Sequence, residues 1–145
     1  MHPLKFSIPI HASKEKVWHT LWQDETFRDW AGIIDPGTYM VGELKEGNEV
    51  QYISSENGYG VTSLVATLVE NEFLLLKHRA DTQGNGKQKR DDQWTGGEES
   101  YRLLEKDGVT TLTTMFDVPS ELKELMSNSY PKALERVKVL AEEKD

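Results

Sequence analysis

One long amphipathic stripe near the end of the chain most constrains its fold. Between Val118 and Asp145, apolar residues recur at alternating spacings of three and four, which places them on one face of a helix. Pro131 interrupts this pattern, but the stripe resumes in phase at Ala133, so we expect a kink near residues 127–130 or two helices in line. A stripe this long needs an equally long apolar partner. Its members are Leu122, Leu125, Met126, Tyr130, Ala133, Leu134, Val137 and Leu140.

The middle of the chain supplies candidate partners in the form of short antiparallel strands. Apolar and polar residues alternate there, and turn signals such as Asn57-Gly58 and Asp107-Gly108 separate the segments. Pro119 ends the last of them. The pattern predicts strands at Lys5–Ile10, Thr38–Val41, Glu49–Ser54, Gly60–Val69, Phe73–Ala80, Glu98–Lys106 and Val109–Val118.

Two short helices are predicted directly after the first strand. Ser13 is a suitable N-cap for Lys14–Trp22, and Asp24 can cap a second helix, Glu25–Trp30, before a turn at Gly32–Gly37. The order of elements is therefore strand, two helices, several strands and a long helix, an α+β pattern. We expect one domain over residues 1–145, in which a curved antiparallel sheet wraps the C-terminal helix.

The composition limits the classes of function. Hydrophobic residues make up 37% and charged residues 29%, as in soluble globular domains. No apolar run approaches the ~18 residues of a membrane-spanning helix, and Met1–Phe6 lacks the pattern of a secretory signal, so we expect a cytoplasmic protein without membrane insertion. The absence of cysteine excludes disulfides, thiol catalysis and thiolate metal sites. A formal charge of −8 disfavours nucleic-acid binding.

Three segments carry distinctive packing and turn residues: Ile10–Trp18 followed by Leu21, Phe27 and Trp30; Gly108–Thr113; and Tyr130–Lys138. They resemble the opening, last-strand and closing-helix motifs of the START-like superfamily, also called SRPBCC. The branch named after the activator of heat-shock protein 90 ATPase is the most similar. The resemblance implies a helix-grip fold with an apolar cavity between sheet and helix. Relatives include lipid and sterol carriers, plant hormone receptors, polyketide cyclases and cochaperone domains.

The inward-facing residues of the predicted helices and strands are the candidate walls of such a cavity. Cavities that bind small molecules are mostly apolar and carry a few polar groups that orient the ligand. The alternative is that these side chains simply fill a core, since buried aromatic residues mainly serve packing. The candidate ligand-binding residues are Phe27, Trp30, Val50, Tyr52, Leu64, Ala66, Leu68, Leu76, His78, Tyr101, Leu112, Phe116, Met126 and Tyr130.

Other kinds of site find little support in the sequence. The four histidines lack the paired spacing of a metal site, and the acids Glu98, Glu99 and Asp117 form no recognisable catalytic pair. There is no nucleophile elbow or phosphate-binding glycine loop. We therefore predict no catalytic residue, no metal and no cofactor. The polar connection Asp81–Trp94 contains the basic run Lys87–Arg90, which could contact a partner or gate the pocket, or could simply be solvated.

These observations leave three hypotheses of function. The first is non-catalytic binding of a small hydrophobic ligand, lipid-like or polyaromatic, by a monomer or weak dimer. The second, implied by the resemblance, is a protein-binding module that regulates a chaperone ATPase, with a role in stress response. The third is a cyclase-type enzyme, which would need His78, Tyr101 or an acid at the floor of the cavity.

Overall fold

The computed structural model describes residues 2–56, 59–83 and 96–143, and the side chains of residues 59 and 80–83 are not described. The predicted order of strands and helices is confirmed. The elements are β1 (His2–Ile10), α1 (Lys14–Trp22), α2 (Asp24–Ile34), β2 (Thr38–Val41), β3 (Glu49–Ser54), β4 (Tyr59–Val69), β5 (Phe73–Gln83), β6 (Glu98–Lys106), β7 (Val109–Val118), a 3₁₀ turn η1 (Ser120–Leu122) and α3 (Lys123–Glu142).

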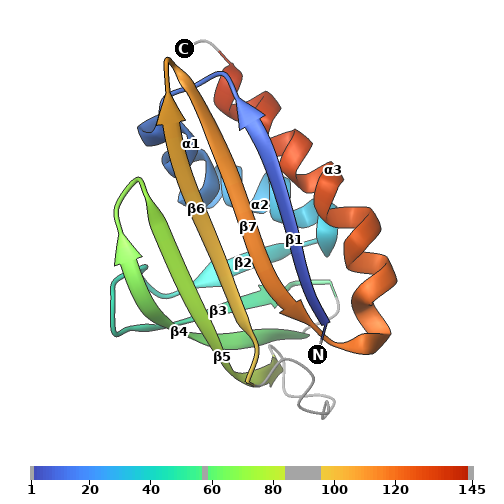
Figure 1. The fold of residues 1–145 in the computed structure, drawn as a ribbon. Helices are drawn as coiled ribbons and strands as arrows, with labels where there is room; N and C mark the ends of the chain where they lie inside the picture. Colours follow the sequence, from blue (N-terminus) through green and yellow to red (C-terminus); the bar gives the residue numbers. More distant parts are fainter. Residues whose placement is uncertain (1, 57–58, 84–95, 144–145) are drawn as a thin grey trace.

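The strands form one antiparallel sheet that curls around α3 (Figure 1). Its order is β1-β7-β6-β5-β4-β3-β2, so the first strand pairs with the last, from His2 opposite Val118 to Ile10 opposite Thr110. The helices α1 and α2 pack against each other and against α3. This arrangement confirms the predicted α+β helix-grip fold.

The helix α3 buries the predicted stripe and is not interrupted at Pro131. The stripe resumes in phase after the proline, and its packing outweighs the lost hydrogen bond. Two predicted members differ: Leu125 is 53% exposed and Leu140 is half-buried, because the buried face turns toward Ala141 at the end of the helix. The buried members are Met126, Tyr130, Ala133, Leu134, Val137 and Ala141.

The helix α2 is longer than the sequence pattern suggested. Gln23, not Asp24, is its N-cap, and it continues through the predicted turn at residues 32–34 to end at Ile34. The apolar face continues at helical spacing from Trp30 to Ala31 and Ile34, which outweighs the ~1 kcal/mol penalty of Gly32 inside a helix. The extension adds two apolar side chains, Ala31 and Ile34, to the wall of a cavity between α2 and the sheet.

A bulge in β4 overturns the predicted inward face of that strand. Val65 pairs with Leu76 and Thr67 with Leu75, so Ala66 is an extra residue without an opposite partner. Before the bulge, Ser63 and Val65 are the buried residues. Leu64 lies opposite exposed Glu49 and Lys77, on the other face. The expectation that Leu64 points inward was therefore wrong, Ala66 forms the bulge, and Leu68, beyond the bulge, packs against the core as expected.

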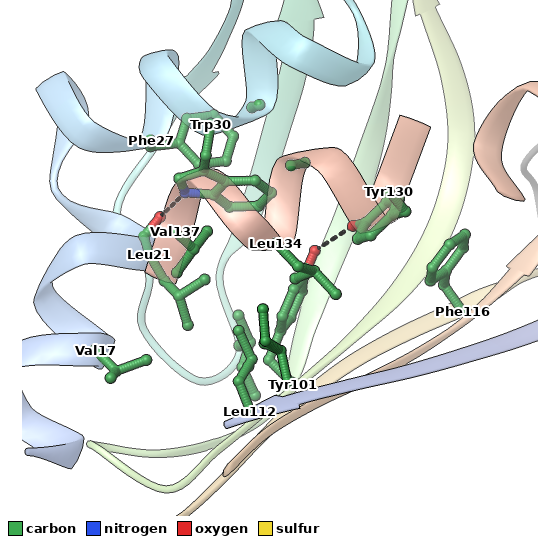
Figure 2. Packing of buried hydrophobic residues seen from close by; sticks show 14 of the residues in the cluster. Val17, Leu21, Phe27, Trp30, Tyr101, Leu112, Phe116, Tyr130, Leu134 and Val137 are labelled. Atoms are coloured by element: carbon green, nitrogen blue, oxygen red, sulfur yellow. Dashed lines mark hydrogen bonds between the residues drawn. The ribbon is translucent and has the colours of Figure 1, made fainter. Parts of the chain in front are cut away.

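The core lies between the sheet, α3 and the two short helices (Figure 2). Trp30 is 2% exposed and donates its indole N–H to the carbonyl oxygen of Leu21 at 3.0 Å, which ties α2 to α1. On the surface, Arg136 of α3 pairs with Asp29 of α2 through two hydrogen bonds of 2.8 and 2.9 Å. Within the described ranges, no helix is long and apolar enough to cross a membrane.

The predicted polar connection Asp81–Trp94 is shorter than expected, because β5 continues to Gln83. The remainder of the connection, including the basic run Lys87–Arg90, lies outside the described residues.

Candidate functional site

A cavity of about 330 Å³ lies between α2, α3 and the strands β3 to β6. Apolar side chains make up much of its wall, and the extended part of α2 contributes Ala31 and Ile34. The exposed side chain of Leu125 lies at its rim. The lining residues are Phe27, Trp30, Ala31, Ile34, Asp35, Thr38, Tyr52, Ser54, Gly60, Val61, His78, Glu99, Tyr101, Leu122, Leu125, Met126 and Tyr130.

A carboxylate and two tyrosines form a hydrogen-bonded chain on the wall of this cavity. The hydroxyl of Tyr101 donates a short hydrogen bond to Glu99. The hydroxyl oxygens of Tyr101 and Tyr130 lie 2.7 Å apart (Figure 2). The hydroxyl group of Tyr101 has one hydrogen, which it donates in the hydrogen bond to Glu99. The hydroxyl group of Tyr130 must therefore be the donor in its hydrogen bond with Tyr101. This series of hydrogen bonds therefore runs from Tyr130 on α3 through Tyr101 to the carboxylate of Glu99 on β6. Each donor in it stabilises the negative charge of that carboxylate.

His78 approaches the same carboxylate from β5. Its Nε2 lies 3.8 Å from Oε1 of Glu99, and its Nδ1 lies 2.7 Å from the hydroxyl oxygen of Ser63. The side chain of His78 is 1% exposed, whereas that of Glu99 is 18% exposed. The Nδ1 of the histidine is therefore held by Ser63, its Nε2 lies near Glu99 beyond hydrogen-bond distance, and the side chain of Glu99 is the more accessible of the two.

A third tyrosine, Tyr52 of β3, also faces the cavity. No residue in the described part of the chain forms a hydrogen bond with its hydroxyl group, although that oxygen is buried. Burial and the nearby charge of Glu99 raise the pKa of Tyr52 well above its usual value. The same two causes raise the pKa values of Tyr101 and Tyr130. All three phenols are therefore neutral over the physiological range of pH.

These pKa shifts predict a loss of stability in alkali. Tyr52, Tyr101 and Tyr130 keep their protons in the native state, but in the unfolded chain they ionise near pH 10. Their contribution to stability is therefore complete below about pH 10 and declines as the pH rises further. Titration of ¹³C-labelled tyrosine side chains by NMR should show that these three ionise only when the protein unfolds. Normal titration of any one in the folded protein would contradict its placement.

The cavity contains half of the fourteen side chains that the sequence put forward. Phe27, Trp30, Tyr52, His78, Tyr101, Met126 and Tyr130 line it. Val50, Leu76, Leu112 and Phe116 are buried in the core without lining it. Leu64 and Ala66 lie in and beside the bulge of β4, and Leu68 lines a different cavity. The ligand-binding role of all fourteen stays a prediction.

Glu99 is the most important lining residue that the sequence-based prediction left out. It shares one face of β6 with Tyr101 and Leu103, which are buried, so strict alternation along the strand could have placed it inward. Its neighbour Glu98 points to solvent. Ala31 and Ile34 were missed because α2 was expected to end at Trp30.

A second cavity of about 360 Å³ is lined by Trp18, Trp22, Met40, Leu44, Leu68 and Glu70. The ring of Trp22 also contacts that of Tyr101, with 4.9 Å between centroids, and that of Phe27 at 6.2 Å. Trp22 therefore lies between the two cavities. Neither cavity belongs to a metal centre formed by the described residues, among which no three potential ligands of the His, Cys, Asp or Glu type gather.

The arrangement of the first cavity suits binding and proton exchange more than covalent chemistry. Glu99 can accept a hydrogen bond or a proton, and Tyr52 can donate or accept one. Apolar side chains around them lower the local polarity, which strengthens a hydrogen bond that a ligand forms with either group. The cavity thus combines a largely apolar wall with polar groups, among them Glu99 and Tyr52, that can orient a ligand.

Several solved structures have a similar fold. Protein MLL2253 from Mesorhizobium loti matches with a TM-score of 0.77 at 13% identity, covering 99% of both chains. The Aha1 dimer from Colwellia psychrerythraea matches with a TM-score of 0.73 at 19% identity, and the match covers 98% of this chain and 97% of that chain. CalU16 from Micromonospora echinospora matches with a TM-score of 0.64 at 16% identity, and the match covers 97% of this chain and 74% of that chain. No family model and no curated protein sequence matches the chain. The START-like resemblance is therefore confirmed as a resemblance of fold.

Proposed function

We propose that this protein binds a small hydrophobic molecule in the cavity between the sheet and α3, without catalysing a reaction. The observation that carries the proposal is a partly open cavity of about 330 Å³ whose largely apolar wall contains Glu99 and Tyr52 among a few polar residues. Binding sites for small molecules have this composition and occupy about 300–1,000 Å³. The volume lies at the low end of that range and favours compact ring systems over long lipids.

Aromatic side chains support binding of a ring-shaped ligand. Phe27, Trp30, Tyr52, Tyr101 and Tyr130 all line the cavity, and edge-to-face contacts already connect Phe27 with Trp30 at 5.3 Å between centroids. Burial of apolar surface stabilises a complex by ~25 cal/mol per Å², and favourable ring contacts add ~0.5–1.5 kcal/mol each. A flat aromatic guest would gain from both.

The test is an NMR titration of the ¹⁵N-labelled protein with a fatty acid, a sterol, a flavonoid and a polyaromatic compound. We expect saturable shifts at residues 27–34, at Tyr52 and at Met126–Tyr130, strongest with the two aromatic compounds. Replacing Leu125 at the rim by tryptophan should obstruct the cavity and weaken binding by about tenfold or more. Val139→Trp is the matched control, because Val139 is 48% exposed on the same helix and does not line the cavity. Absence of shifts with every compound would refute the proposal.

A second candidate is a module that contacts a protein partner. One observation favours it: a solved structure with the same fold is the dimer named Aha1. Leu104 and Met115, 65% and 48% exposed on β6 and β7, offer apolar surface for such a contact. Light scattering across a range of protein concentrations would detect self-association. A strictly monomeric protein whose cavity binds ligand would favour the first candidate.

A further inference from the structure

We propose that the cavity selects aromatic ligands that carry a neutral hydroxyl group. This hydroxyl group donates a hydrogen bond to Glu99 and accepts a hydrogen bond from Tyr52. This inference rests on the proposed ligand-binding function and specifies the polar group of the ligand. It is argued from three features: the free acceptor capacity of the carboxylate, the unsatisfied phenol and the ring-lined wall.

The first feature is the carboxylate of Glu99. A carboxylate offers about four acceptor positions and no donor. Tyr101 occupies one of these positions, and the side chain keeps 18% of its surface exposed to the cavity and solvent. A donor on the ligand would therefore meet a carboxylate acceptor in a largely apolar cavity, and charge-assisted hydrogen bonds are about twice as strong as neutral ones.

The second feature is the hydroxyl group of Tyr52. Among the described residues it has no hydrogen-bond partner, although it is buried. A buried, unsatisfied hydroxyl is unfavourable by ~1–3 kcal/mol, and a ligand that bonds to it removes that penalty. Because the phenol stays neutral, Tyr52 can donate its proton to a ligand oxygen.

Together the two groups match a hydroxyl better than other polar groups. A hydroxyl oxygen carries one proton and two lone pairs, so it can satisfy an acceptor and a donor together. An ether accepts but cannot donate to Glu99, and a carboxylate would place a second negative charge near it. Phenols fit best, since the rings of Phe27, Trp30 and Tyr130 provide the wall for an aromatic body.

Three ligands with the same ring system test this inference by calorimetric titration: 2-naphthol, 2-methoxynaphthalene and 2-naphthoate. We expect 2-naphthol to bind at least about tenfold more tightly than 2-methoxynaphthalene, because the ether lacks the donor for Glu99. We expect 2-naphthoate to bind more weakly than the ether. The ether measures the apolar contribution alone.

Two variants assign the preference to residues. Glu99→Gln removes the negative charge but keeps a hydrogen-bond acceptor for Tyr101. It should reduce the affinity for 2-naphthol by about tenfold and change the affinity for 2-methoxynaphthalene by less than about threefold. Tyr52→Phe should weaken the binding of both ligands, because each ligand has an oxygen that can accept a hydrogen bond from the hydroxyl group of Tyr52. The control for Glu99→Gln is Glu98→Gln, because the side chain of Glu98 is 53% exposed beside Lys77. The control for Tyr52→Phe is Tyr39→Phe, because Tyr39 does not line the cavity. Thermal melts verify that each variant is folded.

The possible outcomes separate this inference from the function on which it rests. Equal affinities of the wild-type protein for 2-naphthol and 2-methoxynaphthalene would overturn the hydroxyl preference and leave the ligand-binding function intact. A preference for 2-naphthol that persists in Glu99→Gln would overturn the assignment to Glu99, and unchanged affinities of both ligands for Tyr52→Phe would overturn the assignment to Tyr52. Failure of all three compounds to bind would overturn the inference, and the function would be refuted as well only if the fatty acid, the sterol, the flavonoid and the polyaromatic compound also produce no shifts. If Glu99→Gln does not fold, the wild-type comparison still decides whether the cavity prefers a hydroxyl group, and Tyr52→Phe still decides whether Tyr52 bonds to the ligand oxygen.

Discussion

Replacing Leu134 by aspartate is expected to unfold the protein. Leu134 is 2% exposed in the middle of α3, in the core beneath the curled sheet (Figure 2). The change removes apolar contacts worth ~2–5 kcal/mol and adds an unpaired buried charge, which is unfavourable by several kcal/mol more. The sum reaches the whole stability of a typical domain, ~5–15 kcal/mol.

Circular dichroism during heating and urea denaturation would measure this effect. The matched control is Val139→Asp on the same helix, where the side chain is 48% exposed and the aspartate stays in water. We expect this control to change the free energy of unfolding by no more than about 0.5 kcal/mol. A cooperative melt of Leu134→Asp close to that of the wild type would disprove the central position of α3.

Replacing Gly60 by alanine is expected to be nearly as damaging, for a steric reason. A Cβ atom at this position would collide with the carbonyl oxygen of Tyr52 and lie 2.8 Å from Cα of Ile53. Both are backbone atoms of the paired strand β3, so they cannot rotate away as a side chain would. The strands must separate locally, and we expect a loss of about 3 kcal/mol or more. Because Gly60 lines the cavity, ligand binding should weaken as well.

Gly32→Ala is the matched control for this prediction. An added Cβ at Gly32 meets nothing within 4 Å, and the residue lies inside α2, where alanine is the better helix former. We expect the free energy of unfolding to rise by about 0.5–1 kcal/mol, the opposite sign to Gly60→Ala. Denaturation curves of the two variants, measured side by side, would check both signs. Equal stability of Gly60→Ala and the wild type would contradict the close approach of β3 and β4.

The order of elements could be predicted from the sequence because each long element repeats its own period. The stripe of α3 continues in phase on both sides of Pro131, and β7 alternates buried and exposed residues over nearly its whole length. Where an extra residue breaks the alternation, the pattern misleads. Ala66 is such a residue, and apolar Leu64 therefore seemed to face the core. A bulge depends on the pairing of two strands, which one strand's sequence does not contain.

The site was harder to predict than the fold. The aromatic lining could be inferred from residues on inward faces, as Phe27 and Tyr101 demonstrate. The volume of the cavity could not, because empty space depends on how side chains from several elements fit together. The inward position of Glu99 was obscured by its chemistry, since a carboxylate on an inward face runs against the usual polar-out pattern. Such local violations of the pattern are where functional groups are expected.

The pairing of β1 with β7 has a consequence for the time course of folding. His2 lies opposite Val118, so the edge of the sheet joins residues from nearly opposite ends of the described chain. During synthesis, β1 leaves the ribosome long before its partner exists, and α3 follows later still. Contacts between such distant residues slow folding, because a large loop must close before they stabilise anything. The nascent chain therefore carries the unpaired apolar face of β1, with Phe6 and Ile8, until β7 has been synthesised, and aggregation is most probable during that interval.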